Sequence, residues 1–454
     1  MTQLNERLAN DREAMIETLR RLVRIRSVED LGGGGKPFGE GVHACFEEAM
    51  AICREMGFET HNMDDMVGWC EVGSGDEMVA VLGHLDVVPE ADGWNVPPYE
   101  GIVTDNKMFG RGTIDDKGPV VASLYALKAI QDLGLPLKRR VRILFGLNEE
   151  TGAIDMKYYK AHGGEIPVMG FTPDGEFPLI NGEKGIINET YHKRLNQTGD
   201  WRIQKMSGGV AGNVAPDHAE ADVLCPAGTV LPEAEKIHLT PIEGGWRVEA
   251  DGISAHGSHP EAGENAIGRL AIYLNQLPFE GDMKDALSFL AEKIGMDCFG
   301  EKIGCPLKDE LSGPFTFNMG VIESDGSFVQ VKLNYRYPVT CEYEDCQPVI
   351  LDAFTQAGWS MTAHLHKPKL YIPEDSKLVQ SLLKVYREAT GDMTPPKSIG
   401  GGTYAKAIPN ILAFGPLFDG DEVREHKPNE YIDLDRLVQN AQIIAAAILE
   451  LANN

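Results

Sequence analysis

The chain has 454 residues and a formal net charge of −27, because 69 acidic residues oppose 42 lysines and arginines. This length predicts two or three domains, and the negative field excludes nucleic acid and anionic membrane surfaces as natural partners. Hydrophobic residues make up 43% and charged residues 24% of the chain, which is typical of globular proteins and excludes disordered, collagen-like and membrane-embedded classes.

The N-terminal segment is polar and mixed in charge, unlike the basic start and apolar core of a secretory signal. The most apolar late run, residues 443–449, is much shorter than the ~18 residues that predict a membrane span. The eight cysteines form no C-x-x-C pair, so neither a thiolate zinc site nor a disulfide framework is indicated. We therefore expect a cytoplasmic protein.

The first half of the chain alternates between helical and strand-like patterns. Apolar residues recur at helical spacing in residues 4–25, 42–56 and 117–133. Short apolar runs of the kind that form buried strands occur at 78–82, 141–145 and 168–171. This alternation predicts an α/β fold with a mixed, mostly parallel sheet covered by helices.

After about residue 186 the pattern changes to alternating apolar and polar residues, as in 218–223 and 329–337. Such alternation is typical of antiparallel strands with one exposed face. Helical spacing returns after Pro373 and ends in a predicted helix at 434–451.

These changes divide the chain into a discontinuous α/β domain, residues 1–185 and 378–454, and an inserted α+β domain, residues 186–377. Two strands of the insert end in proline after a glycine-rich turn, so a further hypothesis is that the insert consists of two similar halves.

Acidic residues and a histidine directly follow three of the apolar runs. His84 and Asp86 follow the first run, Glu149 and Glu150 the second, and Asp174 the third. Because ligands of open α/β sheets bind beyond the carboxyl ends of the strands, these side chains should converge. Each residue alone also fits a plainer role, such as a solvated loop acid or a core histidine, but the coincidence favours a site.

A further acidic pair, Asp115 and Asp116, lies where the helix at 117–133 should begin, which also fits helix capping. Clustered carboxylates repel each other unless positive charge lies among them. Two divalent cations would supply that charge, and oxygen and imidazole ligands suit zinc, manganese or cobalt. One of Glu149 and Glu150 could then bind metal while the other acts as a general base on a water between the metals.

Five ordered motifs resemble those of the M20 metallopeptidase family: Gly83–Pro89, Gly110–Gly118, Asn148–Gly152, Pro173–Pro178 and His426–Glu430. Within the family, the long insert and the glycines of 400–404 are most similar to the dipeptidase V group of carnosinase-like aminoacyl dipeptidases. The resemblance implies a zinc-peptidase-like catalytic domain, an inserted lid domain, and hydrolysis of dipeptides with a free N-terminus.

The resemblance also implies a dinuclear centre, with zinc as the first expectation and manganese or cobalt as alternatives. Asp115 would bridge the two ions. His84 and Asp174 would complete one site, and Glu150 and His426 would complete the other.

Glu149 would act as general base and acid on the metal-bridging water. Asp86 would hydrogen-bond the His84 imidazole and fix its ring. The peptide bond after Asp115 would be cis, as in the family.

The insert adds candidates that the same resemblance assigns to the substrate. His256 would stabilise the oxyanion, Asn213 would lie near the substrate, and Arg336 would bind its C-terminal carboxylate. Gly401 and Gly402 would allow close approach of the substrate backbone. From the strand pattern alone, Arg336 could equally belong to a solubilising polar face, and both interpretations stay open.

The sequence therefore predicts a monomeric metallo-dipeptidase whose partner is a small peptide. An N-acyl-amino-acid deacylase or desuccinylase of the same family would share the metal motifs, so it stays open. A non-catalytic binding protein on this scaffold is the third hypothesis, which the intact Glu149 disfavours. A monomer is expected because residues 186–377 form a longer insert than the dimerisation lids of many relatives.

Overall fold

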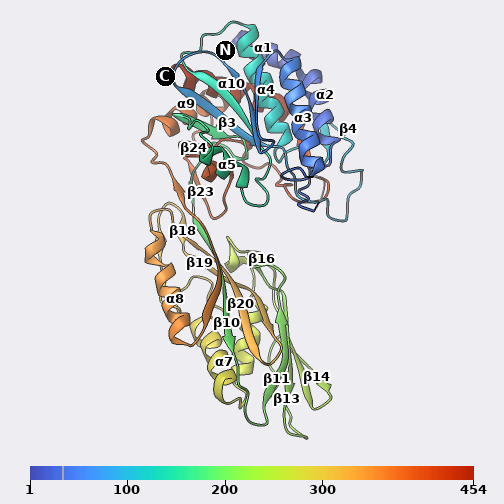
Figure 1. The fold of residues 1–454 in the computed structure, drawn as a ribbon, viewed down its shortest axis with the longest axis vertical. Helices are drawn as coiled ribbons and strands as arrows, with labels where there is room; N and C mark the ends of the chain where they lie inside the picture. The colour runs from blue at the N-terminus through green and yellow to red at the C-terminus, as the bar shows by residue number, and fades with distance from the viewer. Residues whose placement is uncertain (33–34) are drawn as a thin grey trace. The chain divides into compact units, whose positions relative to one another are not determined.

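The computed structural model describes residues 1–32 and 35–454. It divides into two compact units (Figure 1). Each unit has its own hydrophobic core. The residues of the first unit are Met1–Asn181, Ile372–Lys397 and Gly402–Asn454, and those of the second are Gly182–Tyr371 and Ser398–Gly401.

The first unit is built on a mixed sheet. Its strands follow one another in the order β1 (Glu59–Met63), β2 (Val67–Val72), β6 (Arg140–Gly146), β3 (Met78–His84), β7 (Met169–Thr172) and β24 (Ile411–Ala413). The neighbours β6, β3, β7 and β24 are parallel, whereas β1, β2 and β6 pair antiparallel. The predicted α/β class is confirmed, and the parallel pairing lies in the centre of the sheet, where apolar runs are buried on both faces.

Helices surround this sheet, and α4 and α10 contact both each other and β3. The longer helices of the unit are α1 (Thr2–Asn10), α2 (Arg12–Val23), α3 (Glu40–Glu55), α4 (Lys117–Asp132), α5 (Ile154–Ala161), α9 (Lys377–Thr390) and α10 (Leu434–Asn453). The Asp433 side chain caps α10 by accepting the backbone N–H groups of Asp435 and Arg436. No helix of residues 1–32 or 35–454 is long and apolar enough to cross a membrane.

The helix predicted at residues 4–25 is two helices, because the chain leaves helical geometry between α1 and α2 at Asp11. Asn10 and Asp11 are poor formers of helix interiors, since their side chains compete for backbone hydrogen bonds. Helical spacing continues across this break, so the periodicity of the apolar residues did not reveal it.

A small antiparallel sheet brings two distant motifs together. Its strands are β4 (Ile102–Thr104), β5 (Lys107–Phe109) and β26 (Tyr431–Asp433), and β5 pairs with both of the others. The segment after β5 contains Asp115, and the segment before β26 contains His426. The pairing therefore brings the C-terminal motif to the start of α4. The larger sheet continues after β24 with β9 (Ile180–Glu183) and β22 (Leu370–Tyr371), and β23 (Lys397–Ile399) also pairs with β9. Further short elements are β8 (Gly175–Glu176), β25 (Pro416–Leu417) and the 3-10 helix η3 (Tyr404–Ala407).

The second unit contains an antiparallel sheet with helices packed on it, which agrees with the alternating sequence pattern. In order across the sheet, the strands are β14 (Ile237–Ile242), β15 (Gly245–Asp251), β13 (His218–Leu224), β11 (Arg202–Gly208), β19 (Thr316–Ser324), β20 (Phe328–Tyr337), β10 (Gly185–Arg194) and β21 (Ser360–Lys367). The helices are α6 (Ala266–Asn275), α7 (Gly281–Lys293) and α8 (Gln347–Gln356). Helix α6 contacts β13, β15 and β19, while α8 contacts β21.

Candidate functional site

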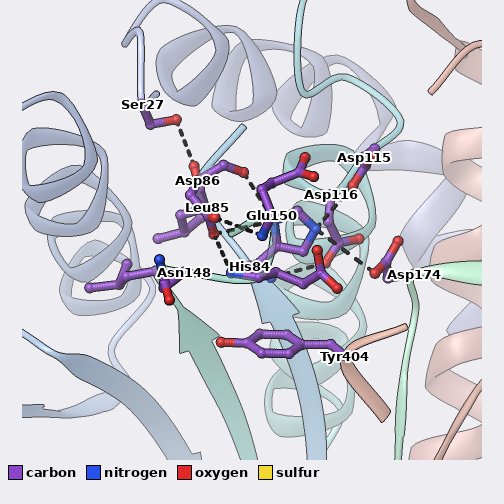
Figure 2. A network of polar contacts seen from close by, with 12 residues as sticks. Ser27, His84, Leu85, Asp86, Asp115, Asp116, Asn148, Glu150, Asp174 and Tyr404 are labelled. Atoms are coloured by element: carbon purple, nitrogen blue, oxygen red, sulfur yellow. Dashed lines mark hydrogen bonds and ion pairs between the residues drawn. The ribbon is translucent and has the colours of Figure 1, made fainter. Parts of the chain in front are cut away.

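Parallel strands carry the predicted ligands to one edge of the first unit's sheet (Figure 2). His84 is the last residue of β3, and Asp174 follows β7. Glu149 and Glu150 follow β6. Because β6, β3 and β7 are parallel neighbours, their carboxyl ends lie together. Asp115 joins them from the segment just before α4.

Asp115 lies between two histidines and presents one carboxylate oxygen to each. Its Oδ1 is 3.0 Å from Nε2 of His84, and its Oδ2 is 3.0 Å from Nε2 of His426. Asp174 Oδ2 lies 3.9 Å from Nε2 of His84. Glu150 Oε2 lies 3.0 Å from Nε2 of His426. The five side chains thus form two groups that share Asp115, and the ligand atoms of each group lie within 4.8 Å of one another.

The peptide bond between Asp115 and Asp116 is cis, as predicted. The two neighbouring aspartates do different things. Asp115 faces both histidines, whereas the buried Asp116 carboxylate accepts the backbone N–H of His84 at 3.1 Å. Burial raises the pKa of Asp116 well above its usual value.

The cluster contains more acids than its two histidines can balance. Burial, followed by repulsion from Asp115, raises the pKa of Asp174 to about 7. Burial, followed by repulsion from Asp174, raises the pKa of Glu149 well above its usual value. Hydrogen bonds to Asp115 and Glu150 raise the pKa of His426 to about 11. Positive charge is therefore what the cluster lacks.

The donor set fits divalent cations. Each group offers one imidazole nitrogen and carboxylate oxygens, and Asp115 belongs to both groups. Nitrogen and oxygen donors without thiolate suit zinc, manganese or cobalt, and a shared carboxylate is the usual bridge of a two-metal site.

The Asp86 carboxylate, which was expected to hydrogen-bond the His84 ring, mainly contacts the backbone of another segment. The nearer contact of His84 Nδ1, at 3.0 Å, is to the backbone carbonyl of Asp86, while the Asp86 carboxylate is 3.5 Å away. That carboxylate instead accepts the backbone N–H groups of Glu149 at 3.2 Å and Glu150 at 3.1 Å. Asp86 therefore joins the end of β3 to the segment that follows β6.

Arg111 and Glu430 form a buried ion pair beside Asp115. Arg111 Nη1 donates to Glu430 Oε2 at 2.7 Å, and both side chains are almost completely buried. Glu430 Oε1 also accepts the backbone N–H groups of Ile114 at 3.0 Å and Asp115 at 3.4 Å. These contacts connect the C-terminal motif to the Asp115 segment, and removing either partner would leave an unpaired buried charge at a cost of about 3–5 kcal/mol.

The predicted lid residues belong to the second unit. Arg336 is only 3% exposed, so its interpretation as part of a solubilising face is wrong. Its Nη1 donates to the carbonyl of Gly400 at 2.6 Å and its Nε to Asn334 Oδ1 at 3.2 Å. Burial lowers the pKa of Arg336 to about 10. Both of these hydrogen-bond partners are neutral, which leaves the buried guanidinium suited to an anion.

Other lid residues lie near this arginine within the second unit. His256 Nδ1 is 2.6 Å from Ser258 Oγ. The carbonyl of Asn213 accepts the backbone N–H of Gly257 at 2.7 Å. A Cβ added to Gly400 would lie 2.8 Å from Cβ of Ser258, so these segments pack closely.

The two remaining glycines lie on either side of the boundary between the units, with Gly401 in the second and Gly402 in the first. Gly402 is exposed. A Cβ on Gly401 would meet only Ile399, at 3.6 Å. The roles proposed for both glycines and for His256, Asn213 and Arg336 at the substrate stay predictions.

Sequence reasoning missed two buried residues of the site, Asp155 and Tyr404. Asp155 looks like an ordinary acid in the first turn of a helix, which is where the structure places it in α5. Tyr404 lies in a glycine-rich segment, and only the glycines of that segment were assigned a role from the sequence. No local pattern connects the two residues, which are 249 positions apart yet hydrogen-bonded.

Comparisons with known proteins identify the family of the chain. The family model described as "Peptidase family M20/M25/M40" matches residues 80–450. A Bacillus subtilis protein named "Putative dipeptidase YtjP" is 36% identical over 457 residues, covering 97% of this chain and 98% of that protein.

Solved structures with the same fold include human carnosine dipeptidase 1, with 15% identity, a TM-score of 0.59 and 100% of both chains covered. The YXEP protein of Bacillus subtilis, described as a dinuclear metal binding peptidase from the M20 family, has 11% identity and a TM-score of 0.52, with 97% of this chain and 99% of that chain covered.

The chain therefore belongs to peptidase family M20/M25/M40. It is an enzyme that hydrolyses peptide bonds, with a catalytic sheet-and-helix fold that carries an inserted second unit.

Proposed function

We propose that this protein is a metallo-dipeptidase that hydrolyses dipeptides with a free N-terminus by means of two divalent cations. The observation that carries the proposal is the pair of ligand groups that share Asp115. The name of the 36% identical relative supports the substrate class, as does the likeness to human carnosine dipeptidase 1.

His84, Asp115 and Asp174 would hold one cation. Glu150 and His426 would hold the other together with Asp115. When bound, the cations polarise the substrate carbonyl and lower the pKa of the attacking water.

Glu149 belongs to neither ligand group, although its backbone is held beside them through Asp86. Its carboxylate takes one proton from the attacking water as the new carbon–oxygen bond forms. It then delivers that proton to the amine nitrogen as the carbon–nitrogen bond breaks. The products are two free amino acids, and Glu149 ends each cycle unprotonated.

The second unit would supply substrate contacts. The Arg336 guanidinium would bind the C-terminal carboxylate of the dipeptide, and its burial against neutral partners supports an anionic ligand. His256 would stabilise the oxyanion, with Ser258 holding its other ring nitrogen. Asn213, Gly401 and Gly402 would complete the substrate contacts.

A substrate panel tests the proposal directly. Enzyme stripped with a chelator and reloaded with zinc, manganese or cobalt is assayed on Ala-His and β-Ala-His, and in parallel on N-acetyl- and N-succinyl-amino acids. We expect metal-dependent release of histidine from the dipeptides. Hydrolysis of an acyl substrate without cleavage of any dipeptide would instead establish the deacylase alternative.

The variant Glu149→Gln tests the general base. It keeps the shape of the side chain but removes the proton acceptor, so we expect kcat to fall about 10²- to 10⁴-fold. Metal content, measured by mass spectrometry of the elements, should stay unchanged. Glu235→Gln makes the same charge change at an exposed position and should keep full activity. Normal turnover by Glu149→Gln would assign the base elsewhere.

We also propose a cytoplasmic monomer. All eight cysteines are free in the structure, which agrees with a reducing compartment. Sedimentation should give a mass near 49.7 kDa, and a mass near twice that value would contradict the monomer.

A further inference from the structure

Asp155 fixes the backbone just before the catalytic glutamates. This carboxylate is completely buried in the first turn of α5. Its Oδ2 accepts the backbone N–H groups of Leu147 at 2.6 Å and Asn148 at 3.1 Å. Its Oδ1 accepts the N–H of Met156 at 2.6 Å.

Asp86 does the same for the next two residues, Glu149 and Glu150. Four consecutive backbone N–H groups, those of residues 147–150, are therefore all accepted by two buried carboxylates, Asp86 and Asp155. The path of this backbone decides where the side chains of Glu149 and Glu150 begin, and both acids are hydrogen-bonded to it.

Tyr404 connects this arrangement to His84. Its hydroxyl donates to Asp155 Oδ2, the same oxygen that accepts Leu147 and Asn148. Its ring lies edge-on to the His84 ring, with 6.1 Å between centroids and 86° between planes (Figure 2).

The Tyr404 ring also fills the space that a side chain at the end of β6 would occupy. A Cβ on Gly146 would lie 2.1 Å from Tyr404 Cε1 and from its hydroxyl oxygen. The ring is only 1% exposed. Tyr404 thus contacts the end of β6, the His84 ligand and the Asp155 carboxylate at once.

We propose that Tyr404 and Asp155 are positioning residues, which hold the backbone of residues 147–150 so that Glu149 reaches the attacking water and Glu150 reaches its cation. The inference rests on the proposed function for the roles of the two glutamates. The hydrogen bonds and the ring packing that support it are independent of that function.

A buried tyrosine–carboxylate hydrogen bond could instead serve stability alone, and the chain offers a matched control for that case. Tyr386 is 2% exposed, lies in α9 of the same unit, and donates its hydroxyl to Asp392 Oδ2 at 2.9 Å. Its ring stacks on Phe177. Tyr386→Phe removes the same chemical group as Tyr404→Phe without touching the segment that carries the glutamates.

The experiment compares Tyr404→Phe and Asp155→Asn with Tyr386→Phe in the full-length, metal-loaded enzyme. Both test variants keep the size of the side chain. Kinetics on Ala-His give kcat and KM separately, calorimetric titration with Mn²⁺ gives cation affinity, and amide hydrogen exchange reports on peptides that cover residues 147–150.

For Tyr404→Phe we expect kcat to fall about 10- to 100-fold, because small displacements of catalytic groups are that costly, while KM changes less than about threefold. Amide hydrogen exchange in residues 147–150 should be faster. Mn²⁺ affinity should fall, because the Glu150 carboxylate is held less firmly in its position. Asp155→Asn should show the same pattern more strongly, because the amide keeps only one acceptor oxygen for N–H groups that both carboxylate oxygens now accept, so an NH2 group must face an N–H group on one side. Tyr386→Phe should change melting temperature only.

Equal kcat and equal exchange in Tyr404→Phe, Asp155→Asn and Tyr386→Phe would overturn the inference. If the wild-type enzyme cleaves no dipeptide, the proposed function fails, and the exchange and Mn²⁺ measurements still decide the positioning. Faster exchange at residues 147–150 in Tyr404→Phe but not in Tyr386→Phe then supports it, and equal exchange refutes it.

Discussion

Asp115 presents one carboxylate oxygen to His84 and the other to His426. Asp115 therefore belongs to both ligand groups. Two hydrogen bonds hold the backbone at Asp115 and at its partner His84. Glu430 accepts the backbone N–H of Asp115, and the adjacent Asp116 accepts that of His84. Asp115 therefore joins two groups of side chains that could hold cations, and the other members of these groups come from separate parts of the chain.

This sharing predicts how metal content responds to substitution. Asp115→Ala should reduce the bound metal from two ions toward zero, because both sites lose a ligand. Asp174→Ala should leave about one ion per chain, because Asp174 belongs only to the His84 group. Elemental analysis after dialysis measures both stoichiometries, and equal metal loss in the two variants would contradict the sharing.

Between elements, one ion pair connects the segment after α2 to the loop between β3 and β4. Arg26 Nε lies 3.0 Å from both carboxylate oxygens of Glu90, and the Tyr99 hydroxyl donates to Glu90 Oε2 at 2.8 Å. The hydrogen bonds from Arg26 are the main reason that the pKa of Glu90 falls from its usual 4.5 to about 2. The loop that leaves the His84 strand is thereby tied to the helical layer.

This shift predicts a pH-dependent stability. A carboxyl whose pKa is lower in the folded state stabilises the fold at pH values above 4.5, and this contribution is lost as pH falls from 4.5 toward 2. Glu90→Gln should therefore unfold at lower urea concentration than wild type at pH 7, and the difference should shrink at pH 3. Glu235→Gln, at an exposed position, is the control. A difference that does not depend on pH would refute the assignment.

On the scale of the whole molecule, the chain forms two units with separate cores, and the second unit consists of an insert, residues 182–371, together with residues 398–401. The two ends of the insert are paired, with Gly182 opposite Tyr371 and Glu183 opposite Leu370 in antiparallel register. An insert whose ends meet can be added to a loop at small cost in chain entropy, since it leaves the path of the host chain unchanged.

We therefore expect residues 182–371 to fold when expressed alone. This fragment contains all of the second unit except Ser398–Gly401, including its whole eight-stranded sheet and its core. Calorimetry should show a cooperative thermal transition. Residues 1–181 alone should show none, because they lack β24, α9 and α10 of their own unit. A fragment 182–371 that melts without cooperativity would contradict an independent core.

Some features of the fold and the site could be predicted from local sequence patterns, and others could not. The apolar runs that precede His84, Glu149 and Asp174 could be recognised, because a buried strand and its end are visible in the pattern of a few neighbouring residues. The spacing of apolar residues could not reveal the break at Asp11, because both helices bury the same kind of face. Arg336 could not be assigned to a buried position, since its strand pattern also fits a polar surface.

The sequence by itself determined the kind of chemistry. The acids and the histidine that follow the strands define the types of ligand atom, and the ordered motifs define the family. Only the tertiary structure decided how that set is held. Arg111 with Glu430, Asp155 with Tyr404, and Asp86 with the Glu149 backbone are contacts between segments 63 to 319 positions apart. Such contacts depend on the packing of the whole chain and leave no periodic pattern in the sequence, which is why they became visible only in the fold.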